Sequence, residues 1–171
     1  AEEDCLKKEE IPSILSRIKL FSDLLPAVAD REYVLESVPE NMELKQNLFQ
    51  QLDELCPPDT ILASNTSSLP LSGMMALVRE ERKMRMIVTH MFNPAHLIPL
   101  VELSCFGNMP EEICQEVESL YRSIGKQPIR VLQDVPGLVA NRIMQGVARE
   151  VFSLLEQGVA EAGDIDKALK F

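Results

Sequence analysis

Hydrophobic positions along this chain follow two alternating patterns, short apolar runs and longer segments with helical spacing. Leucines recur at every third or fourth position through residues 41–55, which predicts a helix with one apolar face. Residues 110–124 form a second predicted helix, with a proline near its start and Gly125 just beyond its end. Short apolar runs predict strands at residues 17–20, 33–38, 60–63, 83–89, 98–103 and 128–132. Alternating strands and helices are typical of an α/β fold, in which helices cover a parallel sheet.

The pattern becomes purely helical towards the end of the chain. One long helix is predicted after the VPG turn and ends at Gly158, and a second begins near Asp164 and continues to the last residue. The sequence therefore predicts a sheet domain at residues 1–134. Residues 135–171 are expected to be the truncated start of an all-helical domain.

Composition and charge narrow the possible classes of protein. The chain has 171 residues, of which 46% are hydrophobic and 26% charged, as in a soluble globular protein. Its net charge of -10 argues against nucleic acid or an anionic membrane surface as a partner, because both attract basic patches. No apolar run reaches the roughly 18 residues of a membrane span. Widely spaced cysteines are expected to be reduced thiols, which predicts a cytoplasmic location; they are Cys5, Cys56, Cys105 and Cys114.

The two histidines and one glutamate are the first candidates for chemistry. His90 ends a predicted strand, and Glu102 lies near the end of the next one. If these strands ran parallel, both side chains would meet at the carboxyl edge of the sheet, where ligands bind. A carboxylate beside an imidazole fixes its tautomer and makes a general base. The alternative is an incidental loop histidine and a solvent-facing glutamate. With His96 and the cysteines, these residues lack the compact spacing of a metal site, so no metal is expected.

Two polar segments allow either a structural or a binding role. SNTSSL, residues 64–69, offers hydroxyls and an amide that could cap a helix or cradle a ribose, a nicotinamide amide or a substrate hydroxyl. Asn141 and Arg142 open the long predicted helix, where a helix start can point an amide or a cation at a ligand. An ordinary first-turn polar pair is the alternative.

Six segments in the same order and spacing resemble the L-3-hydroxyacyl-CoA dehydrogenase family. They are VPENMELKQNLFQQLDEL (38–55), ILASNTSSL (61–69), HMFNP (90–94), PLVEL (99–103), IGKQPIRV (124–131) and DVPGLVANRI (134–143). The resemblance implies a partial Rossmann-like, doubly wound sheet that lacks its first βαβ unit, followed by the start of an all-α dimerisation domain. It also implies NAD as cofactor, a homodimer in fatty acid metabolism, and oxidation of a short L-3-hydroxyacyl-CoA, such as hydroxybutyryl-CoA, to the 3-ketoacyl-CoA.

The resemblance assigns roles to particular residues. His90 is similar to the family's catalytic acid/base and Glu102 to its partner carboxylate. Ser67 is similar to the serine that hydrogen-bonds the reacting oxygen, and Asn141 to the asparagine that positions the substrate. The positions around the ribose and nicotinamide of NAD are matched by Glu40, Lys45, Asn65 and Asn93.

This sequence departs from the family in two ways. None of its glycines forms the G-x-G-x-x-G turn that receives the pyrophosphate, so we expect an internal fragment that does not bind NAD by itself. Pro99 stands where the acyl-CoA members usually carry lysine, and PLVEL with VPEN also resembles the gulonate dehydrogenase (lambda-crystallin) and carnitine dehydrogenase branch. A free small hydroxy acid is therefore the alternative substrate. A non-catalytic, crystallin-like structural protein is the alternative of another class.

Overall fold

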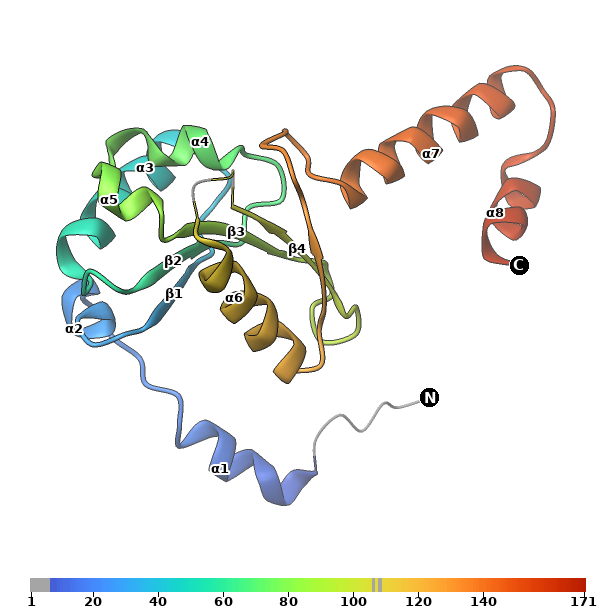
Figure 1. Ribbon diagram of the computed structural model, residues 1–171. Helices are drawn as coiled ribbons and strands as arrows, with labels where there is room; N and C mark the ends of the chain where they lie inside the picture. The colour runs from blue at the N-terminus through green and yellow to red at the C-terminus, as the bar shows by residue number, and fades with distance from the viewer. Residues whose placement is uncertain (1–6, 106, 108) are drawn as a thin grey trace.

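The computed structural model describes residues 7–105, 107 and 109–171, which fold into a sheet domain with a helical extension (Figure 1). The sheet contains five strands in the order of the chain: β1 (Tyr33–Glu36), β2 (Ile61–Ser64), β3 (Met86–Met91), β4 (Leu100–Ser104) and β5 (Gln127–Arg130). Neighbouring strands are parallel except β3 and β4, which are antiparallel. The expected mixed α/β, Rossmann-like sheet is confirmed.

Two predictions about strands are wrong. The sheet is not wholly parallel, because residues 92–99 alone join β3 to β4, and a parallel crossover needs about a dozen residues or more. The strand predicted at residues 17–20 is not formed in the described chain. Leu20 in that segment is 93% exposed, so this short apolar run has neither a strand partner nor a core to cover.

Ten helical segments in the described residues surround or extend the sheet. They are η1 (Lys8–Glu10), α1 (Ile11–Leu15), α2 (Leu24–Val28), α3 (Met42–Leu55), α4 (Leu71–Met74), η2 (Met75–Leu77), α5 (Glu80–Lys83), α6 (Glu111–Ser123), α7 (Ala140–Glu156) and α8 (Ala162–Lys170). The helix α3 begins where the side chain of Asn41 accepts a hydrogen bond from the backbone N–H of Leu44. The helix α6 ends before Gly125, whose φ of 79° suits a residue without a side chain.

The two faces of the sheet bury separate cores because successive strand residues point to opposite sides. One face packs against α3 and α4 and includes Phe49, Leu52, Leu62, Met74 and Val88. The other packs against α6 and includes Ile61, Ile87, Val101, Val117 and Tyr121. Helices on both faces give the layered, doubly wound arrangement that Figure 1 shows.

The helices α7 and α8 project away from the sheet in Figure 1. No residue of α7 is buried, and Ile165 is the buried residue of α8. The division between residues 134 and 135 stays a prediction. No helix in the described residues is long and apolar enough to cross a membrane.

Candidate active site

A histidine and a glutamate meet in the middle of the antiparallel pair of strands. His90 of β3 and Glu102 of β4 are direct register partners, and Nδ1 lies 2.8 Å from Oε2. The imidazole is 7% exposed and the carboxylate is fully buried. With Glu102 ionised, Nδ1 carries the proton and Nε2 presents a lone pair, which is the arrangement of a general base. The ring of Phe92 meets the imidazole edge to face, with 5.5 Å between ring centroids.

The second oxygen of Glu102 holds the start of α7. Oε1 accepts hydrogen bonds from the backbone N–H groups of Val139, at 2.8 Å, and Ala140, at 2.9 Å. These N–H groups have no partner within the helix, and the N-terminal end of a helix attracts negative charge. One buried carboxylate therefore orients the imidazole and also joins α7 to the sheet.

Contacts also link Asn141 of α7 to the polar loop after β2. The side-chain amide of Asn141 donates to the backbone oxygen of Ser67 at 3.0 Å. Gly137 donates its N–H to the backbone oxygen of Ser68 at 3.1 Å. The carboxylate of Asp134 accepts the N–H groups at the start of α4. The structure thus joins the four predicted catalytic residues in one network. Two of its links use backbone groups, since Glu102 accepts the first N–H groups of α7 and Asn141 donates to the backbone oxygen of Ser67.

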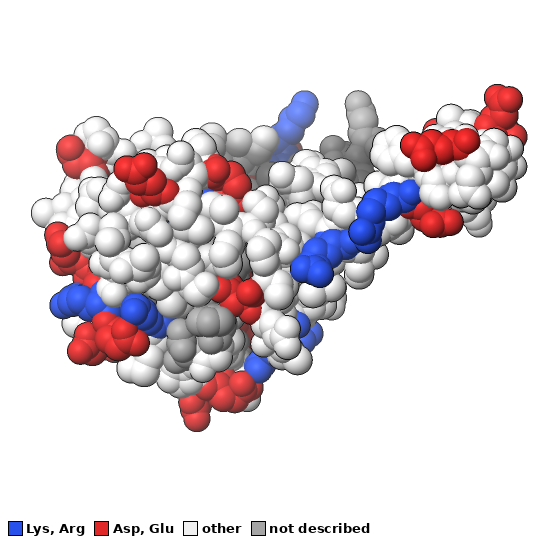
Figure 2. Space-filling model, turned by 90° about the horizontal axis from the view of Figure 1, so that it is seen from above, with Lys and Arg blue, Asp and Glu red and all other residues white. Residues whose placement is uncertain are grey.

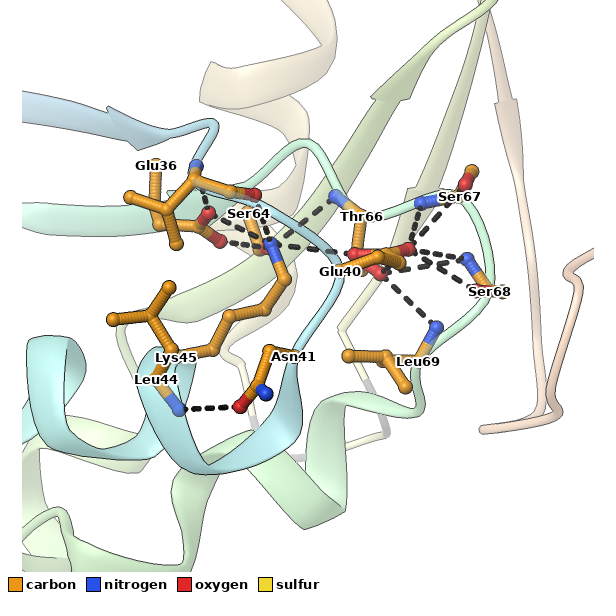
Figure 3. A network of polar contacts seen from close by, with 11 residues as sticks. Glu36, Glu40, Asn41, Leu44, Lys45, Ser64, Thr66, Ser67, Ser68 and Leu69 are labelled. Carbon is orange, nitrogen blue, oxygen red and sulfur yellow. Dashed lines mark hydrogen bonds and ion pairs between the residues drawn. The ribbon is translucent and has the colours of Figure 1, made fainter.

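Glu40 organises the same loop from the other side (Figure 3). Its Oε1 accepts hydrogen bonds from the hydroxyl of Thr66 at 2.6 Å and from the N–H groups of Ser67 and Ser68 at 2.8 and 3.1 Å. The Ser67 hydroxyl is 3.3 Å away, the longest of these contacts. Partial burial opposes ionisation, but these donors and the charge of Lys45 lower the pKa of Glu40 to about 2. The carboxylate is therefore ionised and fixes the loop.

Lys45 is enclosed by oxygen atoms below this loop. Its side chain is 1% exposed, and Nζ lies 2.7 Å from Glu36 Oε1, 3.1 Å from the Val38 oxygen and 3.4 Å from Glu40 Oε2. Glu36 also accepts a hydrogen bond of 2.6 Å from the Ser64 hydroxyl. Glu36 was not among the residues predicted from the sequence, although an acidic residue inside the apolar run YVLESV was a usable signal. This geometry favours an indirect role for Lys45, in holding Glu40, over contact with a ligand.

The two remaining predicted residues lie at the ends of β2 and β3. Asn65 accepts a hydrogen bond of 2.9 Å from the N–H of Met91, so its amide ties the two strand ends together. Asn93 is exposed in the loop between β3 and β4, and its side chain makes no hydrogen bond with the described residues. Lys126 supports this loop by donating to the backbone oxygens of Ala95 and Ile98. Asn93 is therefore open to a ligand, whereas Asn65 is already engaged.

The described part of the chain contains no group of three or more His, Cys, Asp or Glu side chains that could hold a metal ion. His96 is exposed in the loop before β4. Cys56, Cys105 and Cys114 are free thiols, with Cys105 and Cys114 Sγ atoms 3.3 Å apart. Cys5 lies outside the described residues.

Comparison with known proteins identifies relatives along nearly the whole chain. Residues 1–135 match the family model described as 3-hydroxyacyl-CoA dehydrogenase, NAD binding domain. An L-carnitine dehydrogenase of Burkholderia mallei is 36% identical over 156 residues, covering 91% of this chain and 48% of the relative. A probable 3-hydroxybutyryl-CoA dehydrogenase of Bacillus subtilis is also 36% identical, over 170 residues, covering 99% of this chain and 58% of the relative.

Solved structures of dehydrogenases are also similar to this chain. The (S)-3-hydroxybutyryl-CoA dehydrogenase of Ralstonia eutropha superposes with a TM-score of 0.86 at 33% identity, covering 97% of this chain and 57% of the other. The chain thus spans about half the length of the curated relatives it matches.

Proposed function

Since the chain belongs to the 3-hydroxyacyl-CoA dehydrogenase family of oxidoreductases, we propose that the protein carrying it oxidises a 3-hydroxy group with His90 as acid/base. The buried contact of 2.8 Å between His90 and Glu102 is the observation that carries this proposal. It leaves Nε2 of the imidazole free to take the proton of a substrate hydroxyl. The ionised Glu102 stabilises the imidazolium that results, and the proton returns to the substrate oxygen in the reverse direction.

The polar loop supplies the remaining groups. The Ser67 hydroxyl is held only loosely by Glu40, so it can turn and donate a hydrogen bond to the reacting oxygen. Asn141 fixes this loop through the Ser67 carbonyl, and thereby orients the serine. A non-catalytic structural role explains neither the buried dyad nor the loop fixed beside it.

The matched domain is the NAD-binding domain of its family, and NAD is the cofactor. When bound, NAD accepts the hydride from the carbon that bears the hydroxyl. The polar groups after β1 and β3 suit the nicotinamide and ribose, because the amide of Asn93 has no partner among the described residues and Glu40 offers a partly exposed carboxylate oxygen as an acceptor. Lys45 and Asn65 support these positions from beneath.

The preferred substrate is a short 3-hydroxyacyl-CoA, with a free hydroxy acid of the carnitine or gulonate type as the second candidate. Pro99 favours the second candidate, because it offers no cation at the start of β4. Relatives of both kinds match this chain at 36% identity. A comparison of kcat/KM for hydroxybutyryl-CoA, carnitine and gulonate separates the two, and a higher value for a free acid overturns the first choice.

A homodimer is the assembly that we propose for the same protein. The helices α7 and α8 expose apolar side chains that a partner subunit can cover, including Ile143, Phe152 and Leu169, each more than 60% exposed. The cytoplasmic location, which the widely spaced cysteines indicate, stays a prediction.

Substitution of the histidine tests the proposed chemistry directly. His90→Gln should lower kcat by on the order of 10²- to 10⁴-fold, the usual contribution of a general acid/base. The chain offers a matched control in His96→Gln, because His96 is exposed and outside the dyad. Equal effects of the two substitutions on kcat would show that His90 has no special role.

A further inference from the structure

Two arginines of α7 stand out by their lack of partners. From α2 to the end of α7, every other described lysine and arginine contacts a carboxylate or a backbone oxygen. Arg142 and Arg149 are exposed and make no ion pair or hydrogen bond through their guanidinium groups with the described residues. In a chain with a net charge of -10, two cations left without a carboxylate are available to an anion from outside.

The two arginines lie on one face of the helix. Arg142, Gln145 and Arg149 follow one another at three and four residues, the spacing that aligns side chains along an α-helix. Together with Asn141, Pro136 and Gly137 they line a hollow of about 540 Å³. In Figure 2, Lys and Arg side chains form a band along the start of the helical extension, and acidic side chains lie beyond the far end of this band.

The hollow is adjacent to the proposed active site. Asn141, which lines it, is bonded to Ser67, and the first turn of α7 is held by Glu102, the partner of His90. The side chain of Arg142 lies close to Gly137, in the segment between β5 and α7. A Cβ placed on Gly137 would be 3.5 Å from the Cγ of Arg142. Of the two arginines that line the hollow, Arg142 is therefore the one nearer along α7 to Asn141 and to the proposed active site.

We propose that Arg142 and Arg149, assisted by Gln145, bind the anionic group of the substrate. This inference rests on the proposed function, because it extends the same site along α7. A guanidinium offers two parallel N–H donors that match a carboxylate or a phosphate. Both kinds of anion occur among the candidate substrates, as the carboxylate of a free hydroxy acid or the phosphates of a CoA thioester.

The positions of the two arginines along α7 indicate which of these anions each would bind. Arg142 shares the hollow with Asn141, whose amide is bonded to the Ser67 loop, so we assign to it an anion close to the reacting carbon, as in a free hydroxy acid. Arg149 lies two turns farther along the helix, about 10 Å away at a rise of ~1.5 Å per residue. At that distance it can meet the phosphates of a CoA arm but not the carboxylate of a small acid.

The test compares Arg142→Met, Arg149→Met and the double variant in the intact protein. Methionine keeps the unbranched stem and removes the charge. Substrates are 3-hydroxybutyrate, its uncharged methyl ester and 3-hydroxybutyryl-CoA. We expect the double variant to raise KM for the preferred anionic substrate about 10- to 100-fold, the range for hydrogen bonds to a charged group. Turnover of the methyl ester should stay within about threefold.

The single variants show which anion is bound. A higher KM for 3-hydroxybutyrate in Arg142→Met indicates that the site binds the carboxylate. A higher KM for the thioester in Arg149→Met indicates that the site binds the phosphates. The control is Arg122→Met, which removes an exposed arginine paired with Glu118 on α6. Circular dichroism confirms that each variant is folded.

A binding measurement separates failure of this inference from failure of the proposed function. If the wild-type protein oxidises 3-hydroxybutyrate or its thioester and the double variant keeps the wild-type KM, the arginine site is overturned and the proposed function stands. If no hydroxy substrate is oxidised, isothermal titration with acetoacetate and with CoA still tests the site. Weaker binding by the double variant supports it, and equal binding overturns it.

Discussion

At the scale of single residues, buried carboxylates hold the polar groups of the site in place. Glu102 uses one oxygen for His90 and the other for the backbone of α7, so neither oxygen is left without a donor. Glu36 divides its oxygens in the same way, between Lys45 and the Ser64 hydroxyl. A buried charge is tolerated only when such partners replace water.

Lys45→Met tests the most enclosed of these charges. Removing the ammonium leaves Glu36 buried without its cation and weakens the hold on Glu40, so we expect the free energy of unfolding to fall by about 3–5 kcal/mol. Urea denaturation of the folded protein measures the change. Lys83→Met is the control, since Lys83 pairs with the largely exposed Glu80 and should cost at most about 1 kcal/mol. Similar losses at the two positions would contradict the buried network.

At the scale of elements, the loop between β2 and α4 is shaped from outside itself. Glu40, from the segment before α3, accepts its N–H and hydroxyl groups, and Asn141 of α7 donates to its backbone. Asp134 caps the start of α4 through Leu71 and Ser72. Three separated segments therefore determine where Ser67 lies, and a small shift in any of them moves the serine relative to His90.

The ionised Glu40 predicts a dependence of stability on acid pH. Its pKa in the folded protein, about 2, is below its ordinary value of 4.5, so the folded state binds the proton less readily. The contribution is fully present above about pH 4.5 and is lost progressively as the pH falls towards 2. Glu40→Gln should therefore flatten the fall in unfolding free energy over this window, measured by urea denaturation at several pH values. The same change at the exposed Glu112 is the control, and parallel curves for wild type and Glu40→Gln would refute the prediction.

At the scale of the whole molecule, the described chain contains the residues that we propose for the catalytic half of a dehydrogenase site. The strand β1 pairs only with β2 among the described residues, so its other edge is open. The apolar side chains of α7 and α8 are likewise open to a partner. Both features are expected of a surface that other parts of an assembly cover.

The 171-residue chain expressed alone should not bind NADH with useful affinity. The pyrophosphate in this fold rests on a glycine-rich turn and a helix N-terminus, and no glycines of this sequence have that spacing. The groups near Asn93 and Glu40 would contact only the nicotinamide half. Isothermal titration of NADH, with circular dichroism to verify folding, measures this. Micromolar binding by a folded monomer would place the cofactor site elsewhere.

The sequence by itself determined the order of the five strands and of the long helices, because hydrophobic periodicity and the glycine and proline positions are local properties. The strand predicted at residues 17–20 was wrong, and the short helices α1, α2 and α5 were not predicted. The helices at 42–55, 111–123 and 140–156 and the five strands were all predicted within a few residues. The direction of β4 was also available from the sequence, since residues 92–99 are too few for a parallel crossover. The roles of His90, Glu102, Ser67 and Asn141 came from family resemblance and stay predictions.

Only the tertiary structure decided which polar groups face one another. The direct opposition of His90 and Glu102 depends on the register of β3 and β4, and a slip of one residue would turn one side chain to the other face. The enclosure of Lys45 and the bond between Asn141 and Ser67 join residues far apart in the chain. No local pattern encodes such contacts, because each arises where packing excludes water and leaves polar groups to satisfy one another.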